Sequence, residues 1–129
     1  MSGRYLLDTN IVIALFAGDP SVTQHLKKSV NIIIPSIVLG ELYFGAQKSV
    51  HKEKNINLIH EFAKECAVYH CDELTAWHYG KIKGKLKIKG TPIPENDLWI
   101  ASISIQHQIP LVTRDMHFNS IDTLAVIKW

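Results

Sequence analysis

The chain has 129 residues, of which 47% are hydrophobic and 20% are charged, and its formal net charge at pH 7 is +2. This length is enough for an ordinary hydrophobic core, so we expect residues 1–129 to form a single domain, and the composition excludes a disordered chain. No apolar run is long enough to cross a bilayer, and the first residues lack the apolar stretch of a secretory signal. We therefore expect a cytoplasmic protein without membrane contact.

The cysteines and histidines do not predict a redox or zinc site. Cys66 and Cys71 have neither the spacing of a redox pair nor that of zinc ligands, which favours two reduced structural thiols. The seven histidines are scattered and lack the short spacings of histidine metal sites. The histidines therefore give little reason to expect a metal site of their own.

Apolar runs and helix-compatible segments alternate along the chain. Strands are predicted at 5–7, 30–34, 67–70, 110–113 and 124–127, where short apolar or β-branched runs are bounded by polar residues or proline. Helices are predicted at 11–16, from Asp19-Pro20 onward, and at 36–46, 51–66, 72–87 and 98–108. This alternation predicts an α/β fold, a three-layer α/β/α sandwich with a central, mostly parallel sheet and right-handed crossovers.

Asp8 directly follows the first predicted strand and precedes the first predicted helix. Ligand sites in such sheets lie at the carboxyl ends of the strands, so Asp8 is expected at that edge. Asp8 and Thr9 are also good N-cap residues, and taken alone this pattern favours a capping role. Asp115 follows the strand at 110–113 and is expected at the same edge, unless it only shapes a turn.

Two further acids occupy informative positions. Asp97 lies in the first turn of the helix that leads into the strand at 110–113, where the helix dipole also favours an acid. Glu41 lies inside a strongly apolar helix, and no Lys or Arg occurs between Asn31 and Gln47 to neutralise it. Because an unpaired buried charge is costly, Glu41 either faces a narrow solvated stripe or has a cation as its partner.

Four carboxylates that cluster repel one another unless cations hold them together. Oxygen ligands of this kind select Mg²⁺ or Mn²⁺, and such ions activate a water for attack on phosphorus. Thr9 and Thr113 are expected to orient these acids by hydrogen bonds, and Asn119 either contributes an amide oxygen or ends a turn. The remaining eight acids would then face fourteen Lys and Arg, a surface that suits a polyanionic partner.

The chain resembles the PIN-domain family, and specifically the VapC-type toxins of bacterial toxin–antitoxin pairs. The resemblance covers almost the whole chain and consists of LLDTNI at 6–11, PSIVLGELYFGA at 35–46, PIPENDLWIA at 92–101 and LVTRDMHF at 111–118. The order, the spacing and the total length all match. One departure is the sequence His107-Gln108-Ile109, where this family often has a glycine at the end of the helix.

The resemblance implies an α/β/α sandwich that acts as a Mg²⁺- or Mn²⁺-dependent endoribonuclease and leaves a 5′-phosphate and a 3′-hydroxyl. It carries the family's acidic site, as both metal ligands and catalytic residues, onto Asp8, Glu41, Asp97 and Asp115, with Thr113 as a polar neighbour. It also implies a homodimer and a cognate antitoxin protein as partners. The apolar surface of the early helices, including Ile37, Tyr43 and Phe44, is a candidate for the antitoxin contact, although most of these side chains are expected in the core.

The segment 81–90 is a candidate for contact with the RNA substrate. Its five lysines occupy alternate positions: Lys81, Lys83, Lys85, Lys87 and Lys89. Gly84 and Gly90 weaken a helix, so we expect a helix end that runs into a loop. The lysines could follow an RNA backbone, but such a run is more often a solvated face. Trp77 and Trp99 could stack on bases, although both are expected in the core.

Two other functions remain open at this point. An aspartyl phosphotransferase would use Asp8 as the nucleophile, but dehalogenase-type phosphatases need a second acid two residues later, where this chain has Asn10. A catalytically silent module with the same fold would bind RNA or protein without turnover. The presence of all four acids favours the metal-dependent nuclease over this second alternative.

Overall fold

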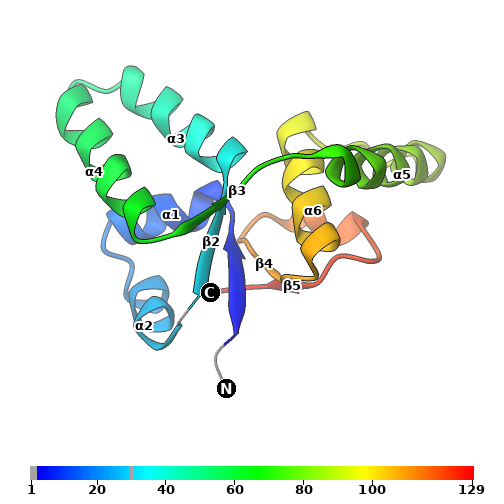
Figure 1. Cartoon of the computed structure of the whole chain (residues 1–129), viewed down its shortest axis with the longest axis horizontal. Coiled ribbons are helices and arrows are strands. Elements are labelled where there is room, and N and C mark those ends of the chain that lie inside the picture. The colour runs from blue at the N-terminus through cyan, green and yellow to red at the C-terminus, as the bar shows by residue number, and fades with distance from the viewer. Residues whose placement is uncertain (1–2, 30) are drawn as a thin grey trace.

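The computed structural model describes residues 3–29 and 31–129, which form a five-stranded sheet flanked by helices (Figure 1). The strands are β1 (Arg4–Leu7), β2 (Asn31–Pro35), β3 (Ala67–Tyr69), β4 (Leu111–Val112) and β5 (Val126–Ile127). The helices are α1 (Thr9–Phe16), α2 (Pro20–Lys28), α3 (Ser36–Gln47), α4 (Lys52–Lys64), α5 (Glu73–Lys89) and α6 (Glu95–His107). A short 3₁₀ helix, η1 (Met116–Ser120), follows β4. Val30, which we placed in the second strand, lies outside the described residues.

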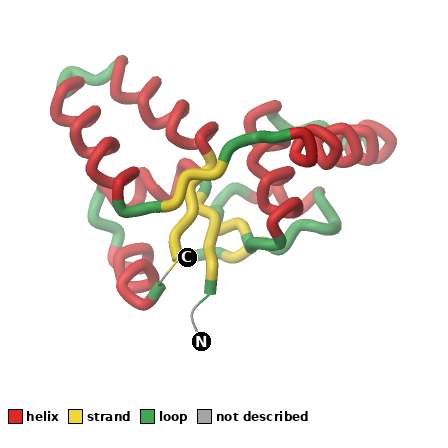
Figure 2. The backbone as a smooth tube through the Cα atoms, viewed as in Figure 1, coloured by secondary structure: helices red, strands yellow, loops and turns green. Residues whose placement is uncertain are grey.

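All strand pairs of the sheet are parallel, in the order β3-β2-β1-β4-β5. Helices α1 to α4 lie on one side of this sheet, and α5 and α6 lie on the other (Figures 1 and 2). The predicted α/β/α sandwich is therefore confirmed. The chain runs from β1 outward to β3 and then returns to place β4 on the other side of β1. This reversal of strand order creates a switch point between β1 and β4, where ligand sites of such sheets form.

Helices cover both faces of the sheet, so the central residues of its strands are apolar on both sides. Leu6 and Leu7 of β1 pair with Leu111 and Val112 of β4, and all four side chains are fully buried. This core is completed by buried side chains from the helices: Ile100 and Ile103 of α6, Val12 of α1 and Val38 of α3. This rigid pairing fixes the ends of β1 and β4 relative to one another.

The helix predicted at 72–87 is confirmed as α5, which continues two residues further to Lys89, so the loop expected within 81–90 begins only at Gly90. A capping box between Asp72 and Thr75 begins this helix, and Gly90 ends it in the left-handed conformation with φ of 72°. Gly84 costs α5 about 1 kcal/mol. Burying Ile82 and Leu86 contributes about 1.5–3 kcal/mol each and outweighs that cost.

Several side chains lie elsewhere than expected. Trp77 is 57% exposed on α5 and Phe44 is 63% exposed on α3, so neither belongs to the core. Trp99 is half-buried and stacks on Tyr79, with 4.0 Å between the ring centroids.

Both cysteines are free thiols, and burial raises the pKa of the Cys66 thiol to about 11. Among the described residues, no helix combines the length and the hydropathy needed to cross a bilayer.

Candidate active site

All four predicted acids line one open cleft at the switch point of the sheet. They come from four different places in the fold: the end of β1, the middle of α3, the first turn of α6 and the end of β4. The residues that line the cleft are Asp8, Thr9, Asn10, Ile13, Glu41, Pro94, Glu95, Asn96, Asp97, Asp115 and His117. The fold therefore brings distant carboxylates to one place, as the positions of Asp8 and Asp115 after parallel strands predict.

Asp8 is the most buried of these acids, with 5% of its surface exposed. One of its carboxylate oxygens accepts a hydrogen bond from the backbone N–H of Thr9 at 2.8 Å. The other accepts from the hydroxyl of Thr113 at 2.7 Å and from the side-chain amide of Asn10 at 3.2 Å. Asp8 thus caps α1 and also lines the cleft, so the two interpretations of this residue are compatible.

Burial raises the pKa of the Asp8 carboxyl above its ordinary value, while the hydrogen bonds from Thr113 and Thr9 act in the opposite direction. The negative charge of Asp115 adds to the increase. Burial also raises the pKa of Asp97, and the charges of Asp8 and Asp115 contribute, whereas the hydrogen bond with His117 lowers it. Asp8 and Asp97 are therefore acids whose ionised forms are poorly solvated and would gain from a nearby cation.

Glu41 is half-buried on α3, next to the end of β1. Its carboxylate accepts a hydrogen bond from the hydroxyl of Thr9 at 2.8 Å. Within the described part of the chain, Glu41 forms no ion pair with a Lys or Arg. The expectation that this acid has no local basic partner is thus confirmed, and its side chain turns to the cleft.

His117, which the sequence did not single out, lies between two of the acids. Its Nε2 contacts a carboxylate oxygen of Asp97, and its Nδ1 lies 2.7 Å from Oδ1 of Asp115. One ligand atom from each of these three residues lies within 4.8 Å of the others. The only signal in the sequence was the position of His117 two residues after Asp115, because its contact with Asp97 depends on how α6 packs beside η1.

The polar residues around the acids differ in their placement. Thr113 is buried and links two acids, since its hydroxyl donates to Asp8 and accepts from the backbone N–H of Asp115 at 3.0 Å. Asn10 was considered only as a missing acid, but its amide joins Asp8, Thr113 and the backbone of Arg114. Asn119 is exposed on η1 and is not among the residues that line the cleft.

The donor set of the cleft fits Mg²⁺ or Mn²⁺. Asp97, Asp115 and His117 already place three ligand atoms within reach of one ion, and Asp8 and Glu41 border the same space. Carboxylate oxygens with open positions for water suit these hard cations, and one imidazole nitrogen is compatible with Mn²⁺. A cation here would offset the repulsion among the acids and the cost of their burial.

The lysines of α5 do not form one stripe, because the helix distributes them over two faces. Lys81, Lys85 and Lys89 line a cavity beside the segment 120–123. Lys83 points to the other side, where its Nζ lies 3.2 Å from Glu95 and donates to the hydroxyl of Tyr79. Lys87 lines the same side as Lys83. Only part of the predicted lysine run can therefore act as a unit.

Comparison with known proteins agrees with the fold. The profile of the PIN domain matches residues 5–124. Ribonuclease VapC2 of Haemophilus influenzae (strain ATCC 51907 / DSM 11121 / KW20 / Rd) is 32% identical over 129 residues, which cover 98% of both proteins. The tRNA(fMet)-specific endonuclease VapC of Salmonella typhimurium is 30% identical, also over 98% of both. In the crystal structure of VapBC2 from Rickettsia felis bound to a promoter DNA fragment, one chain matches with a TM-score of 0.91 and 34% identity, over 98% of both chains.

Proposed function

The chain belongs to the PIN-domain family, and we propose that it is a metal-dependent endoribonuclease, the toxin of a toxin–antitoxin pair, that hydrolyses RNA with the acids of its cleft. The relatives named ribonucleases support the reaction class, and the VapBC complexes among the similar structures support an antitoxin partner. The observation that carries the proposal is the convergence of Asp8, Glu41, Asp97 and Asp115 on one cleft.

We propose that Mg²⁺ or Mn²⁺ is held by these four acids. When bound, such an ion lowers the pKa of a water and neutralises charge that develops on a phosphoryl group. Asp97 and Asp115 both contact His117, and one ligand atom from each of the three residues lies within 4.8 Å of the others. Asp8 is held rigidly by three hydrogen-bond donors, so its carboxylate is fixed before any ligand arrives.

The surrounding residues keep these carboxylates in place. The hydroxyl of Thr9 orients Glu41, and the hydroxyl of Thr113 orients Asp8 and the backbone of Asp115. Ile13, which is 55% exposed and lines the cleft, offers an apolar contact for a ribose or base. The acidic cleft alone would repel an RNA backbone, so binding of the substrate here requires the cation.

The proposed protein partners are an antitoxin and a second copy of the chain. The antitoxin would bind the surface of the early helices, where Phe44 of α3 is exposed, as are Ile13 of α1 and Leu58 of α4. Tyr43 is half-buried and its hydroxyl lies 2.7 Å from Nδ1 of His60 on α4, so Tyr43 and Ile37 support that surface from within. A homodimer is a further expectation from the family, and sedimentation of the purified chain measures it.

The experiment that tests the proposed reaction uses the purified chain, free of any partner, and an end-labelled single-stranded RNA. We expect cleavage with Mn²⁺ or Mg²⁺, none in EDTA, and recovery when the cation is restored. Asp8→Asn should abolish cleavage, whereas Glu61→Gln, an exposed acid on α4, should not change it. Cleavage in EDTA would contradict the mechanism. Binding of RNA without cleavage in every cation would instead support the catalytically silent module.

A further inference from the structure

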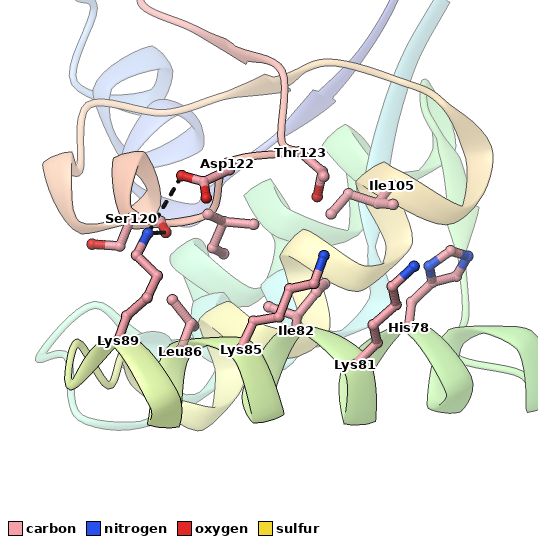
Figure 3. A pocket seen from close by; sticks show the side chains of 11 residues that line it. His78, Lys81, Ile82, Lys85, Leu86, Lys89, Ile105, Ser120, Asp122 and Thr123 are labelled. Atoms are coloured by element: carbon pink, nitrogen blue, oxygen red, sulfur yellow. Dashed lines mark hydrogen bonds and ion pairs between the residues drawn. The ribbon is translucent and has the colours of Figure 1, made fainter.

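A second recess, lined by none of the acids of the cleft, lies between α5 and the segment 120–123 (Figure 3). Its volume is about 130 Å³, and its floor is apolar, formed by Ile82, Leu86, Ile105 and Ile121. Lys81, Lys85 and Lys89 rise from one side of α5 around this floor, with His78 beside Lys81 (Figure 3). The recess therefore combines an apolar base with a basic rim.

The basic rim is only partly neutralised. Lys89 donates to the backbone carbonyl of Ser120 at 2.7 Å and lies 3.3 Å from Asp122. Lys81 and Lys85 form no ion pair with any carboxylate among residues 3–29 and 31–129. Two free ammonium groups beside an apolar floor favour an anionic ligand that also carries apolar surface.

The spacing of these groups fits a nucleic acid strand. Lys81, Lys85 and Lys89 are four residues apart on a helix, which places successive side chains about 6 Å apart along one face. This interval is comparable with that between phosphates on a flexible single strand. Trp77, one turn before Lys81, is 57% exposed, and Nζ of Lys81 lies 5.0 Å from its ring centre. An exposed indole beside a row of cations is a platform on which a base can stack.

The recess and the acidic cleft are linked by η1, whose two ends lie at one hollow each. The five-residue η1 begins directly after Asp115 and ends at Ser120, and His117 lines the cleft whereas Ser120 lines the recess. A 3₁₀ helix of this length spans about 10 Å. A strand that leaves the acids could therefore pass over η1 and reach Lys89 first, then Lys85 and Lys81.

We propose that the face of α5 formed by Trp77, Lys81, Lys85 and Lys89, together with its apolar recess, binds the single-stranded RNA substrate several nucleotides away from the bond that is cut. The lysines contact phosphates, and the recess and Trp77 accept bases. The opposite face of α5 is assigned a smaller part, because Lys83 and Lys87 line a separate hollow that also contains Glu95, to which Lys83 is paired. This inference rests on the proposed function for the identity of the ligand.

The test measures RNA binding rather than cleavage, so that it can be read whether or not the chain proves to be a nuclease. A fluorescent single-stranded RNA of about ten nucleotides is titrated with the full chain in EDTA, over a series of salt concentrations. Lys81→Gln/Lys85→Gln is compared with Lys83→Gln/Lys87→Gln, which removes the same charge from the other face. Thermal unfolding of each variant verifies that it is folded.

We expect Lys81→Gln/Lys85→Gln to weaken RNA binding roughly five- to tenfold and to reduce the salt slope by about 1 to 1.5. Lys83→Gln/Lys87→Gln should bind within about twofold of the parent chain. Equal losses in both variants, or no loss in either, would overturn the proposal. So would equally tight binding of a polyglutamate peptide of the same charge, which would assign the face to an acidic protein, or a change in oligomeric state confined to Lys81→Gln/Lys85→Gln.

Discussion

The hydroxyl of Thr113 donates a 2.7 Å hydrogen bond to the buried carboxylate of Asp8, and this contact joins the ends of two adjacent parallel strands. It exists because Leu7 pairs with Val112, so the next residue of each strand arrives at the same edge of the sheet. The same hydroxyl accepts the backbone N–H of Asp115. Thr113 therefore fixes two of the four acids relative to one another.

Replacing Thr113 with Val should destabilise the chain, because the buried Asp8 carboxylate and the N–H of Asp115 both lose a partner. We expect a loss of about 1–3 kcal/mol in the free energy of unfolding, measured with urea in EDTA. Thr113→Ser keeps the hydroxyl and should retain most of the stability. If Val were tolerated as well as Ser, the hydrogen bond would not hold the site together.

The raised pKa of Asp8 predicts how stability depends on pH in the metal-free chain. Burial raises the pKa of Asp8 in the folded state, so the folded chain binds more protons than the unfolded chain just above pH 4. This residue therefore lowers stability as the pH rises through the interval between its unfolded and folded pKa values. Asp8→Asn removes the ionisation and keeps a similar shape.

The stability advantage of Asp8→Asn over the parent chain should accordingly grow as the pH rises from about 4, and become constant above the folded-state pKa of Asp8. Urea unfolding of both proteins in EDTA at a series of pH values measures this difference. A difference that does not grow at all as the pH rises would mean that the Asp8 carboxylate is well solvated or otherwise neutralised in the fold.

His117 contacts both Asp97 and Asp115, and its replacement should show what these contacts contribute when no cation is present. We expect His117→Ala to lower the free energy of unfolding in EDTA by about 0.5–1 kcal/mol, because Asp97 and Asp115 lose their shared partner. Saturating Mn²⁺ should remove most of this difference, since the cation takes over the same role. A deficit that persists or grows in Mn²⁺ would assign His117 to the ligands of the ion.

Gln108 ends α6 in the left-handed conformation, with φ of 55°, at the position where the family often has glycine. A side chain costs about 1–2 kcal/mol in this conformation, and glycine avoids that cost at some expense in unfolded-chain entropy. Gln108→Gly should therefore increase the free energy of unfolding by about 0.5–1 kcal/mol. Gln108→Ala keeps the Cβ atom and serves as the control. Destabilisation by Gly alone would show that the side chain of Gln108 makes contacts of its own.

The positions of the acids could be predicted from local sequence patterns, because residues that follow the strands of a parallel sheet gather at one edge of it. Asp8 and Asp115 each follow an apolar strand, and Glu41 interrupts an apolar helix without a basic neighbour. The helix at 72–87 could also be predicted, and the last residues of α5 stay helical because the burial of Ile82 and Leu86 outweighs the local preference of Gly84. The apolar pattern around Trp77 was misleading, since α5 buries only a narrow strip of its surface.

The role of His117 depends on tertiary packing alone. Its imidazole reaches Asp97 only because the first turn of α6 lies beside η1, and nothing in the sequence fixes that approach. The lysine run also divides into two faces only because the segment is helical. Residues two positions apart lie on opposite sides of a helix, so alternate lysines face in different directions. The contacts of His117 and the two lysine faces could therefore be identified only from the folded structure.

The central claim is that acids from β1, α3, α6 and β4 hold one divalent cation site, and calorimetric titration with Mn²⁺ tests it most directly. We expect the parent chain to bind Mn²⁺, and Asp8→Asn, Glu41→Gln, Asp97→Asn and Asp115→Asn each to weaken that binding at least tenfold while they remain folded. Glu61→Gln should bind as the parent does. Unchanged Mn²⁺ affinity in any two of the four variants, or binding by none of the proteins including the parent, would contradict the account.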